Sequence, residues 1–327
     1  MGRPELTGVR PDQFAPLAIL DRNGVDESVH FGALVALNGD GTIAFSVGDP
    51  HARIFPRSST KPFQALAMLR NGLDLDDAHL AMVCASHNGE QVHLEHVRRI
   101  LAGAGLGEEA LANTHDHPLH PESAHAAIRS NTPKSSLQMN CSGKHAGMLA
   151  TCMVNGWPIE EYLHHDHPLQ TAITETVTEL AGEPPVAIGV DGCGAPAHVV
   201  SLVQLADGAR RIATGAAGPE GRRVFEAMSQ NPHLVGGTGR HVTGIVGAVP
   251  GLFAKDGAES VYVAAMEDGR AIAMKMSDGS GRATPTVLVE ALRALDVDVS
   301  AVPDSVGEVV LGHGRPVGRV RAVPLGA

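Results

Sequence analysis

Two pairs of apolar, β-branched runs, one near each end of the chain, constrain the fold most strongly. The first pair, residues 32–38 and 42–48, flanks the turn sequence Asn-Gly-Asp-Gly. The second pair, residues 261–266 and 271–276, flanks Glu-Asp-Gly-Arg. Short apolar runs around a glycine-containing turn predict β-hairpins. One largely antiparallel sheet can therefore be assembled from both ends of the chain.

The region between the hairpins has mostly helical periodicity, with apolar residues three and four positions apart. Helices are expected over residues 58–71, 90–103, 142–155, 168–182, 197–205, 221–229 and 285–295. Short strands are expected at 186–190 and 317–323, a long structured loop at 115–136, and either a strand or a helix at 80–85. These elements predict an α/β or α+β fold in a single domain, residues 1–327. Its sheet comes from about 30–50 and 258–325, and a helical or mixed region, 55–255, is inserted between them.

Composition excludes several classes of protein. The chain has 327 residues and a net charge of −11, without a Lys/Arg cluster, so it does not read as a nucleic-acid binder. No apolar run reaches membrane-spanning length, and the stretch from Met1 to Asp21 has no signal-peptide pattern. We therefore expect a cytoplasmic protein without a membrane partner. In that compartment Cys84, Cys141, Cys152 and Cys193 are expected as thiols or metal ligands, not disulfides.

A Ser-x-x-Lys sequence, Ser58 to Lys61, opens the first long expected helix. Residues three apart on a helix share a face, so the Ser58 hydroxyl and the Lys61 amine can meet across one turn. An amine whose pKa is lowered by burial or by a neighbouring cation can take the proton of a serine. The alternative is a helix cap with a solvated lysine, which this common pattern by itself favours.

Two cysteines suggest a metal site. Cys141 and Lys144 have the same three-residue spacing at the start of another helix, and Cys193 lies in a glycine-rich turn after a short strand. Two thiolates with another donor can bind zinc tetrahedrally, and Lys144, His145 and Asp191 are the donors on offer. The spacing matches no standard zinc pattern, and two unrelated buried thiols remain the alternative.

Several segments together resemble the asparaginase II family, the rhizobial-type asparaginases that do not use a catalytic threonine. The resemblance runs over nearly the whole chain. It is carried by Arg57–Gln64, Cys84–Glu90, Asn140–Met148, Asp191–Pro196 and Leu234–Arg240.

This resemblance implies a fold similar to serine β-lactamases and class A glutaminases, and a homodimer. It implies two Ser–Lys pairs, with Ser58 and Lys61 as the first and Ser86 and Lys275 as the second. It also implies zinc bound by Cys141, Lys144 and Cys193, with Asp191 nearby. No Ser-Asp-Asn motif or Lys-Thr-Gly strand is evident, so penicillin hydrolysis is not expected.

The resulting hypothesis is hydrolysis of L-asparagine to aspartate and ammonia through an acyl-serine. Arg57, Asn140, His145 and Asp191 are the candidate substrate-binding residues. Arg57 can match the substrate α-carboxylate or form a structural ion pair, and His145 can orient substrate or cap its helix. Zinc is expected to organise the pocket without being the catalyst. The alternatives are a glutaminase or other small-amide hydrolase, a zinc-dependent amidohydrolase with structural serines, and a non-catalytic zinc-binding protein.

Overall fold

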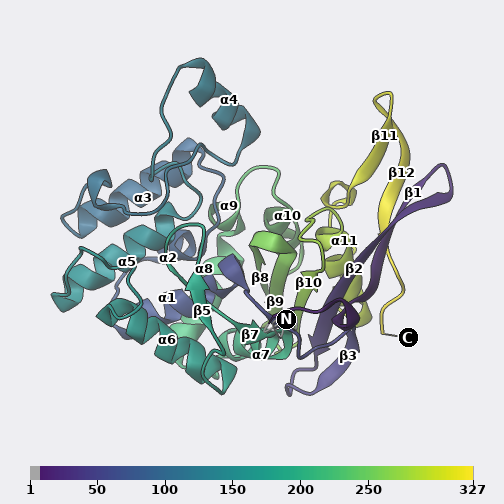
Figure 1. The fold of residues 1–327 in the computed structure, drawn as a ribbon, viewed down its shortest axis with the longest axis horizontal. Coiled ribbons are helices and arrows are strands. Elements are labelled where there is room, and N and C mark those ends of the chain that lie inside the picture. The colour runs from purple at the N-terminus through teal and green to yellow at the C-terminus, as the bar shows by residue number, and fades with distance from the viewer. Residues whose placement is uncertain (1–7, 327) are drawn as a thin grey trace, which may run out of the picture.

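The computed structural model describes residues 8–326 of the chain. The expectation that the N-terminus carries no signal peptide falls partly on residues 1–7, which lie outside the described residues. Figure 1 shows a helical region on one side and a twisted sheet on the other, with the segments from both chain ends in the sheet. The predicted mixed α/β class with a largely antiparallel sheet is confirmed. No helix within residues 8–326 is both long enough and apolar enough to cross a membrane.

The main sheet has eight strands in the order β11-β12-β1-β2-β10-β9-β8, with β3 paired to β2. All of its pairs are antiparallel. The strands are β1 (Ala15–Arg22), β2 (Val25–Leu37), β3 (Ile43–Val47), β8 (Leu252–Gly257), β9 (Val261–Met266), β10 (Ala271–Met276), β11 (Val309–Gly312) and β12 (Arg315–Ala322).

Both predicted hairpins are present, as β2–β3 and β9–β10. The two ends of the chain meet at two places, where β2 pairs with β10 (Ala36 opposite Ile272) and β1 pairs with β12 (Ala18 opposite Ala322). The sheet begins earlier than predicted in both halves, at Ala15 and at Leu252. The first part of β2 is exposed, so it lacks the alternating apolar pattern that marks a half-buried strand.

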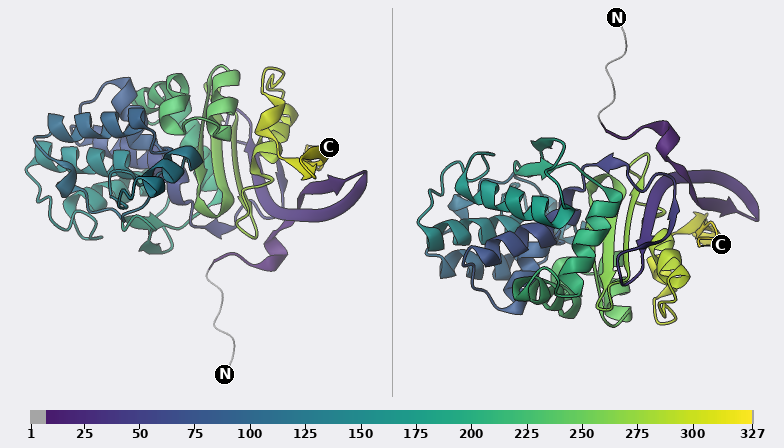
Figure 2. Two further views of the ribbon diagram at one scale, coloured as in Figure 1. Left: turned by 90° about the horizontal axis from the view of Figure 1, so that it is seen from above. Right: turned by 90° about the horizontal axis from the view of Figure 1, so that it is seen from below.

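The central strands are covered on both faces, because residues 32–37 of β2 are all buried. Alternate residues face opposite sides of a sheet. Val35 and Leu37 belong to the larger core with the helical region, whereas Leu34 and Ala36 belong to a second core. Helix α7 (Leu202–Ala213) packs on the first side, and α10 (His241–Ala248) and α11 (Thr284–Ala294) lie on the second (Figure 2).

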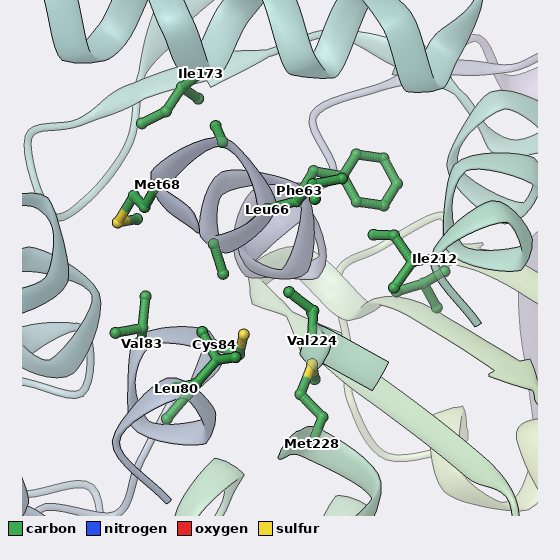
Figure 3. Close-up of a cluster of buried hydrophobic side chains, with 14 of the residues drawn as sticks. Phe63, Leu66, Met68, Leu80, Val83, Cys84, Ile173, Ile212, Val224 and Met228 are labelled. Carbon is green, nitrogen blue, oxygen red and sulfur yellow. The ribbon is translucent and has the colours of Figure 1, made fainter. Parts of the chain in front are cut away.

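Helix α1 (Lys61–Arg70) lies at the centre of the larger core. Figure 3 shows Phe63, Leu66 and Met68 radiating from it toward apolar side chains of the surrounding helices. The other helices of this region are α2 (Asp77–Cys84), α3 (Gln91–Gly103), α4 (Pro121–Arg129), α5 (Ser142–Asn155), α6 (Pro168–Ala181), α8 (Pro219–Gln230) and α9 (Pro232–Val235). The ambiguous segment 80–85 is therefore helical.

Two expected elements of the inserted region were wrong. The segment 115–136 was expected as a loop but contains α4, whose polar sequence gives little apolar signal. Residues 197–205 were expected as a helix. There β6 (Pro196–His198) instead pairs with β5 (Ile188–Val190), and β7 (Val200–Ser201) pairs with β4 (Arg53–Ile54). The helix α7 starts only after Ser201, whose side chain forms a capping box with Gln204.

Candidate active site

A small pocket of about 260 Å³ lies where loops from the helical region meet the end of β8. It is smaller than the roughly 300–1,000 Å³ typical of sites for drug-sized ligands, so it suits a small molecule. Its walls are Arg57, Ser58, Ser86, Leu119, Met139, Asn140, Cys141, Asp191, Gly192, Cys193, Arg240, Asp256, Gly257 and Ala258. Many of the residues singled out in the sequence therefore converge here from distant segments.

Ser58 lines this pocket, but it does not pair with Lys61 as expected. Residues Arg57–Thr60 form a 3₁₀ turn, η2, so Ser58 precedes the α-helix that starts at Lys61. Within residues 8–326, no hydrogen bond joins the Ser58 hydroxyl to the Lys61 amine. Arg57 adopts a left-handed backbone conformation with φ 54°, which is costly for a residue with a side chain.

Lys61 instead reaches Ser86, which follows the end of α2. The Lys61 side chain is buried, and its Nζ lies 3.1 Å from Ser86 Oγ and 3.2 Å from Cys141 Sγ. It also donates to the carbonyl of Ala85. These partners are a carbonyl, a hydroxyl and a thiol, so no carboxylate holds this amine. The structure thus brings the predicted Lys61 and Ser86 together across two different helices.

Close approach between η2 and the sheet depends on Gly257 at the end of β8. A Cβ at this position would lie 2.5 Å from the Pro56 carbonyl oxygen and 2.8 Å from Ser59 Oγ. Ser59 Oγ also donates to the carbonyl of Lys255 at 3.2 Å. Only glycine allows β8 to pack this tightly against the turn that carries Ser58.

A second buried lysine, Lys255, was not singled out in the sequence. Its Nζ lies 2.6 Å from Asp256 Oδ1, and the other Asp256 carboxylate oxygen pairs with Arg240. Burial lowers the pKa of Lys255 to about 8, and Lys61 adds to this shift while Asp256 opposes it. Burial by itself would raise the pKa of Asp256, but Lys255 and Arg240 hold it well below its usual range.

Lys275, the expected second lysine, has other partners. Its Nζ donates to the carbonyls of Glu259 and Met276, each at 2.6 Å, and no described hydrogen bond joins it to Ser58 or Ser86. Burial lowers its pKa, opposed by nearby carboxylates, and Lys61 does not contribute to this shift. Lys255 rather than Lys275 is therefore the lysine electrostatically coupled to Lys61.

Arg57 and Asp191 form a salt bridge at the mouth of the pocket, with Arg57 Nε 2.6 Å from Asp191 Oδ1. The Gly192 amide donates to this same carboxylate oxygen. The side chains are 25% and 14% exposed, so the pair is partly desolvated. Within the part of the chain that the structure describes, the Arg57 terminal nitrogens and Asp191 Oδ2 make no other hydrogen bond, which leaves a cation and an anion facing the pocket.

The predicted metal ligands also come together. Lys144 Nζ donates to Cys193 Sγ at 3.1 Å, and the Cys141 and Cys193 thiols are near enough to influence each other's ionisation. The neighbouring Cys141 thiol and the charge of Lys144 lower the pKa of Cys193 despite its burial, and Cys193 together with burial raises the pKa of Cys141. Although burial opposes it, the charge of the thiols raises the pKa of Lys144. Two thiols and an amine, two of them from the start of α5 and one from the turn after β5, are a donor set that fits zinc.

The other two candidates differ in their placement. Asn140 lines the pocket, and its Oδ1 accepts from Cys141 Sγ at 2.9 Å. His145 lies behind the pocket, fully buried, with Nδ1 2.8 Å from the Tyr162 hydroxyl, and burial lowers its pKa to about 4. A direct role of His145 in orienting substrate therefore has no support from its position.

A separate group, Glu90, His93 and His233, brings three possible metal-ligand atoms together. Both His93 ring nitrogens are already engaged, Nδ1 by the Glu90 amide at 3.2 Å and Nε2 by the His233 carbonyl at 3.1 Å. Glu90 and His93 form a capping box at the start of α3, so this group is a weaker candidate for a metal site than Cys141, Lys144 and Cys193.

Sequence inspection missed Lys255, Asp256 and Arg240. A Lys-Asp pair directly after the buried run Leu252–Ala254 was the available signal, because charges in a buried strand need partners. Arg240 ends the glycine-rich segment that had been noted only for its resemblance.

A buried lysine beside a serine, in a small polar pocket, is typical of enzymes that attack a carbonyl with an activated hydroxyl. A family model described as L-asparaginase II matches residues 18–322, and the chain belongs to that family.

The comparisons with individual proteins are more distant. No curated protein matches the chain. Among solved structures, Mglu in its native form in 4.3 M NaCl is similar with a TM-score of 0.37 and 14% identity, over 81% of this chain and 60% of Mglu. Another Mglu structure gives a TM-score of 0.36 and 16% identity, over 81% of this chain and 66% of that chain. The chain thus spans about 60% of the length of the first of these.

Proposed function

We propose that this protein is an L-asparagine amidohydrolase that releases L-aspartate and ammonia through an acyl-serine intermediate. Family membership supports hydrolysis of an amide. The observation that carries the mechanism is the 3.1 Å distance between Lys61 Nζ and Ser86 Oγ in a pocket for a small molecule.

Lys61 has the geometry of a general base. Its Nζ donates to the Ala85 carbonyl, to Ser86 Oγ and to Cys141 Sγ, and in the neutral form proposed for catalysis its lone pair would replace the N–H that points at Ser86 and accept the hydroxyl proton. Lys61 then takes the Ser86 proton as the oxygen bonds to the side-chain carbonyl carbon of asparagine. The C–N bond breaks as that proton passes to the leaving ammonia, and water hydrolyses the ester with Lys61 as base again.

Ser58 is the second serine of the site. It lines the same pocket from η2, and its hydroxyl makes no hydrogen bond within residues 8–326. We assign it the supporting role, because Ser86 is the hydroxyl in contact with an amine. In this proposal Lys255 replaces Lys275 as the second lysine, and burial together with the charge of Lys61 lowers the pKa of Lys255.

The Arg57–Asp191 pair is proposed to bind the α-carboxylate and the α-ammonium of the free amino acid. The guanidinium suits the α-carboxylate, and the unused Asp191 oxygen suits the α-ammonium. A substrate that lacks either group loses one charged contact and binds more weakly.

Zinc, held by Cys141, Lys144 and Cys193, is proposed as an organising ion. When bound it would fix the two thiolates and the amine that form one wall of the pocket. Ser86 and Lys61 supply the nucleophile and the base independently of it.

The test is ammonia release from asparagine and glutamine, measured side by side for wild type, Ser86→Ala and Ser58→Ala, with folding checked by circular dichroism. We expect wild-type turnover of asparagine, the largest loss in Ser86→Ala and a smaller loss in Ser58→Ala. A preference for glutamine would make the protein a glutaminase. Near-normal turnover in both variants would favour a metal-dependent amidohydrolase, and no release by wild type would favour a non-catalytic binding protein.

We further propose a cytoplasmic homodimer. The mass in solution, measured by light scattering, tests the oligomeric state.

A further inference from the structure

The polar chain Lys255–Asp256–Arg240 links the sheet to the loop that carries Ser86. Asp256 accepts from Lys255 with Oδ1 at 2.6 Å and from Arg240 with Oδ2. Arg240 Nη1 then reaches the Ser86 carbonyl at 3.4 Å. This series of hydrogen bonds therefore starts on β8, passes along the pocket wall and ends at the backbone of Ser86, the proposed nucleophile.

The loop that carries Ser86 and Asn88 is hydrogen-bonded to the segment that carries Arg240. The Ser86 amide donates to the Val235 carbonyl at 3.1 Å, and the Asn88 amide donates to the Gly236 carbonyl at 2.8 Å. Asn88 Nδ2 adds a bond to the Thr238 carbonyl at 2.9 Å. Movement of Arg240 would therefore move Ser86 with it.

We propose that Arg240 and Asp256 are positioning residues that set the geometry of Ser86 and the protonation of Lys255 together. This inference rests on the proposed function, because it gives Lys255 a part in the reaction. Asp256 binds the Lys255 ammonium directly, and Arg240 shares the same carboxylate, so the two cations compete for one anion. The pair is partly desolvated, with side chains 22% and 16% exposed, which strengthens this competition.

Several charged or titratable groups act on Lys255 from the elements around it. Asp256 follows it on β8, Lys61 approaches from α1, and Arg240 approaches from the start of α10. Cys84 at the end of α2 and His241 on α10 are close enough to feel its charge. Asp256 is the anion of this set, so its removal and the removal of Arg240 have opposite effects on Lys255.

The experiment uses the full chain with Asp256→Asn and Arg240→Gln. Loss of the anion leaves Lys255 beside two cations and lowers its pKa, whereas loss of Arg240 removes a cation and raises it. We expect shifts on the order of one pH unit in opposite directions. The first readout is the titration of the Lys255 side chain by NMR with ¹³Cε-labelled lysine, assigned with Lys255→Arg. The second is the pH dependence of kcat/KM for ammonia release from asparagine, whose rising limb should move down in Asp256→Asn and up in Arg240→Gln.

The matched control is Arg210→Gln, which breaks another partly buried pair, Arg210–Asp207, with side chains 19% and 36% exposed. It should leave both readouts unchanged. Arg240→Lys keeps the positive charge but loses the planar guanidinium that contacts Asp256 and the Ser86 carbonyl together. We expect its Lys255 titration to match wild type while its kcat remains below the wild-type value.

The outcomes separate the two proposals. If the Lys255 pKa shifts in the same direction in folded Asp256→Asn and Arg240→Gln, or does not shift in either, the positioning role is overturned even if wild type releases ammonia. Opposite NMR shifts in a protein that releases no ammonia support the coupling of these residues and reject the proposed reaction. A variant that fails to fold is replaced by Asp256→Glu or Arg240→Lys, for which a titration identical to wild type together with an unchanged kcat overturns the proposal.

Discussion

Lys61 and Lys255, two buried lysines beside the pocket, lie in opposite electrostatic surroundings. Lys61, on the helical side, contacts a carbonyl, a hydroxyl and a thiol, whereas Lys255, on the sheet side, is ion-paired with Asp256. Lys61 lies against the hydroxyl that we propose it activates, whereas burial lowers the pKa of Lys255 to about 8 although Asp256 opposes the shift. The helical side therefore places an amine on the proposed nucleophile, and the sheet side holds its amine in an ion pair.

The largest effect is expected for Ser86→Ala, which removes the hydroxyl beside Lys61 on the helical side. We expect kcat for asparagine to fall on the order of 10⁴-fold, because the nucleophile is lost. Single-turnover ammonia release measures it, with Ser59→Ala as the control for a buried serine whose hydroxyl donates to the Lys255 carbonyl. A larger loss in Ser58→Ala than in Ser86→Ala would move the nucleophile to η2.

Acid should act on His198 and on Asp256 in different pH windows. His198 is buried on the helical side, and burial lowers its pKa from 6.5 to about 4. Its neutral form is the folded one, so stability is intact above pH 6.5 and declines as pH falls toward 4, by about 3 kcal/mol in total. The lowered pKa of Asp256 has its effect below the ordinary carboxyl value of 3.8, where protonation costs further stability.

Urea unfolding between pH 7 and 4 measures this loss. His198→Gln cannot be protonated but can still bond Thr174, which now lies 2.9 Å from His198 Nε2. We expect a shallower decline in this variant, and a slope equal to that of wild type would remove His198 from the explanation.

The contact between the two sides can be tested at Gly257. A methyl group there collides with the Pro56 carbonyl, so Gly257→Ala should cost about 1–3 kcal/mol and reduce kcat as η2 shifts. Thermal unfolding and turnover measure both effects. The control is Gly103→Ala in α3, where a Cβ meets nothing within 4 Å and a helix gains from alanine. Equal effects of the two substitutions would contradict the close-approach argument.

Chelation should have the smallest effect and should act on the helical side alone. Removal of a zinc ion loosens Cys141, Lys144 and Cys193, so we expect KM for asparagine to rise about tenfold with little change in kcat. Turnover before and after dialysis against a chelator, followed by zinc addition, measures this. Complete and zinc-reversible loss of kcat with the fold intact would make the ion part of the chemistry.

The sequence predicted features that depend on neighbours along the chain. The β9–β10 hairpin and α5 lie where their apolar patterns indicated, and Ser86, named through the family resemblance, lines one pocket with Cys141 and Cys193. Contacts across the fold were harder to predict. Lys275 and Lys255 both lie in buried strands, and only the pairing of β8 with β9 and the approach of Arg240 decide which lysine lies near Lys61.

The Ser58–Lys61 pairing stays a prediction, because within residues 8–326 the Lys61 amine is directed to Ala85, Ser86 and Cys141. The left-handed Arg57 starts a 3₁₀ turn that carries Ser58, and the α-helix begins only at Lys61. Proline at position 62 permits a helix start, but it does not specify how many residues before it are already helical.

The joining of β1 to β12 has a consequence for the order of assembly during synthesis. Ala18 of β1 pairs with Ala322 of β12, and β1 leaves the ribosome about three hundred residues before β12. One edge of β1 therefore has no partner until β12 has been synthesised. The helical insert can gather its own apolar core in the meantime, because its contacts are nearer in sequence. Catalytic competence would then arise late, when the strand that bears Lys255 finally docks against an already formed helical half.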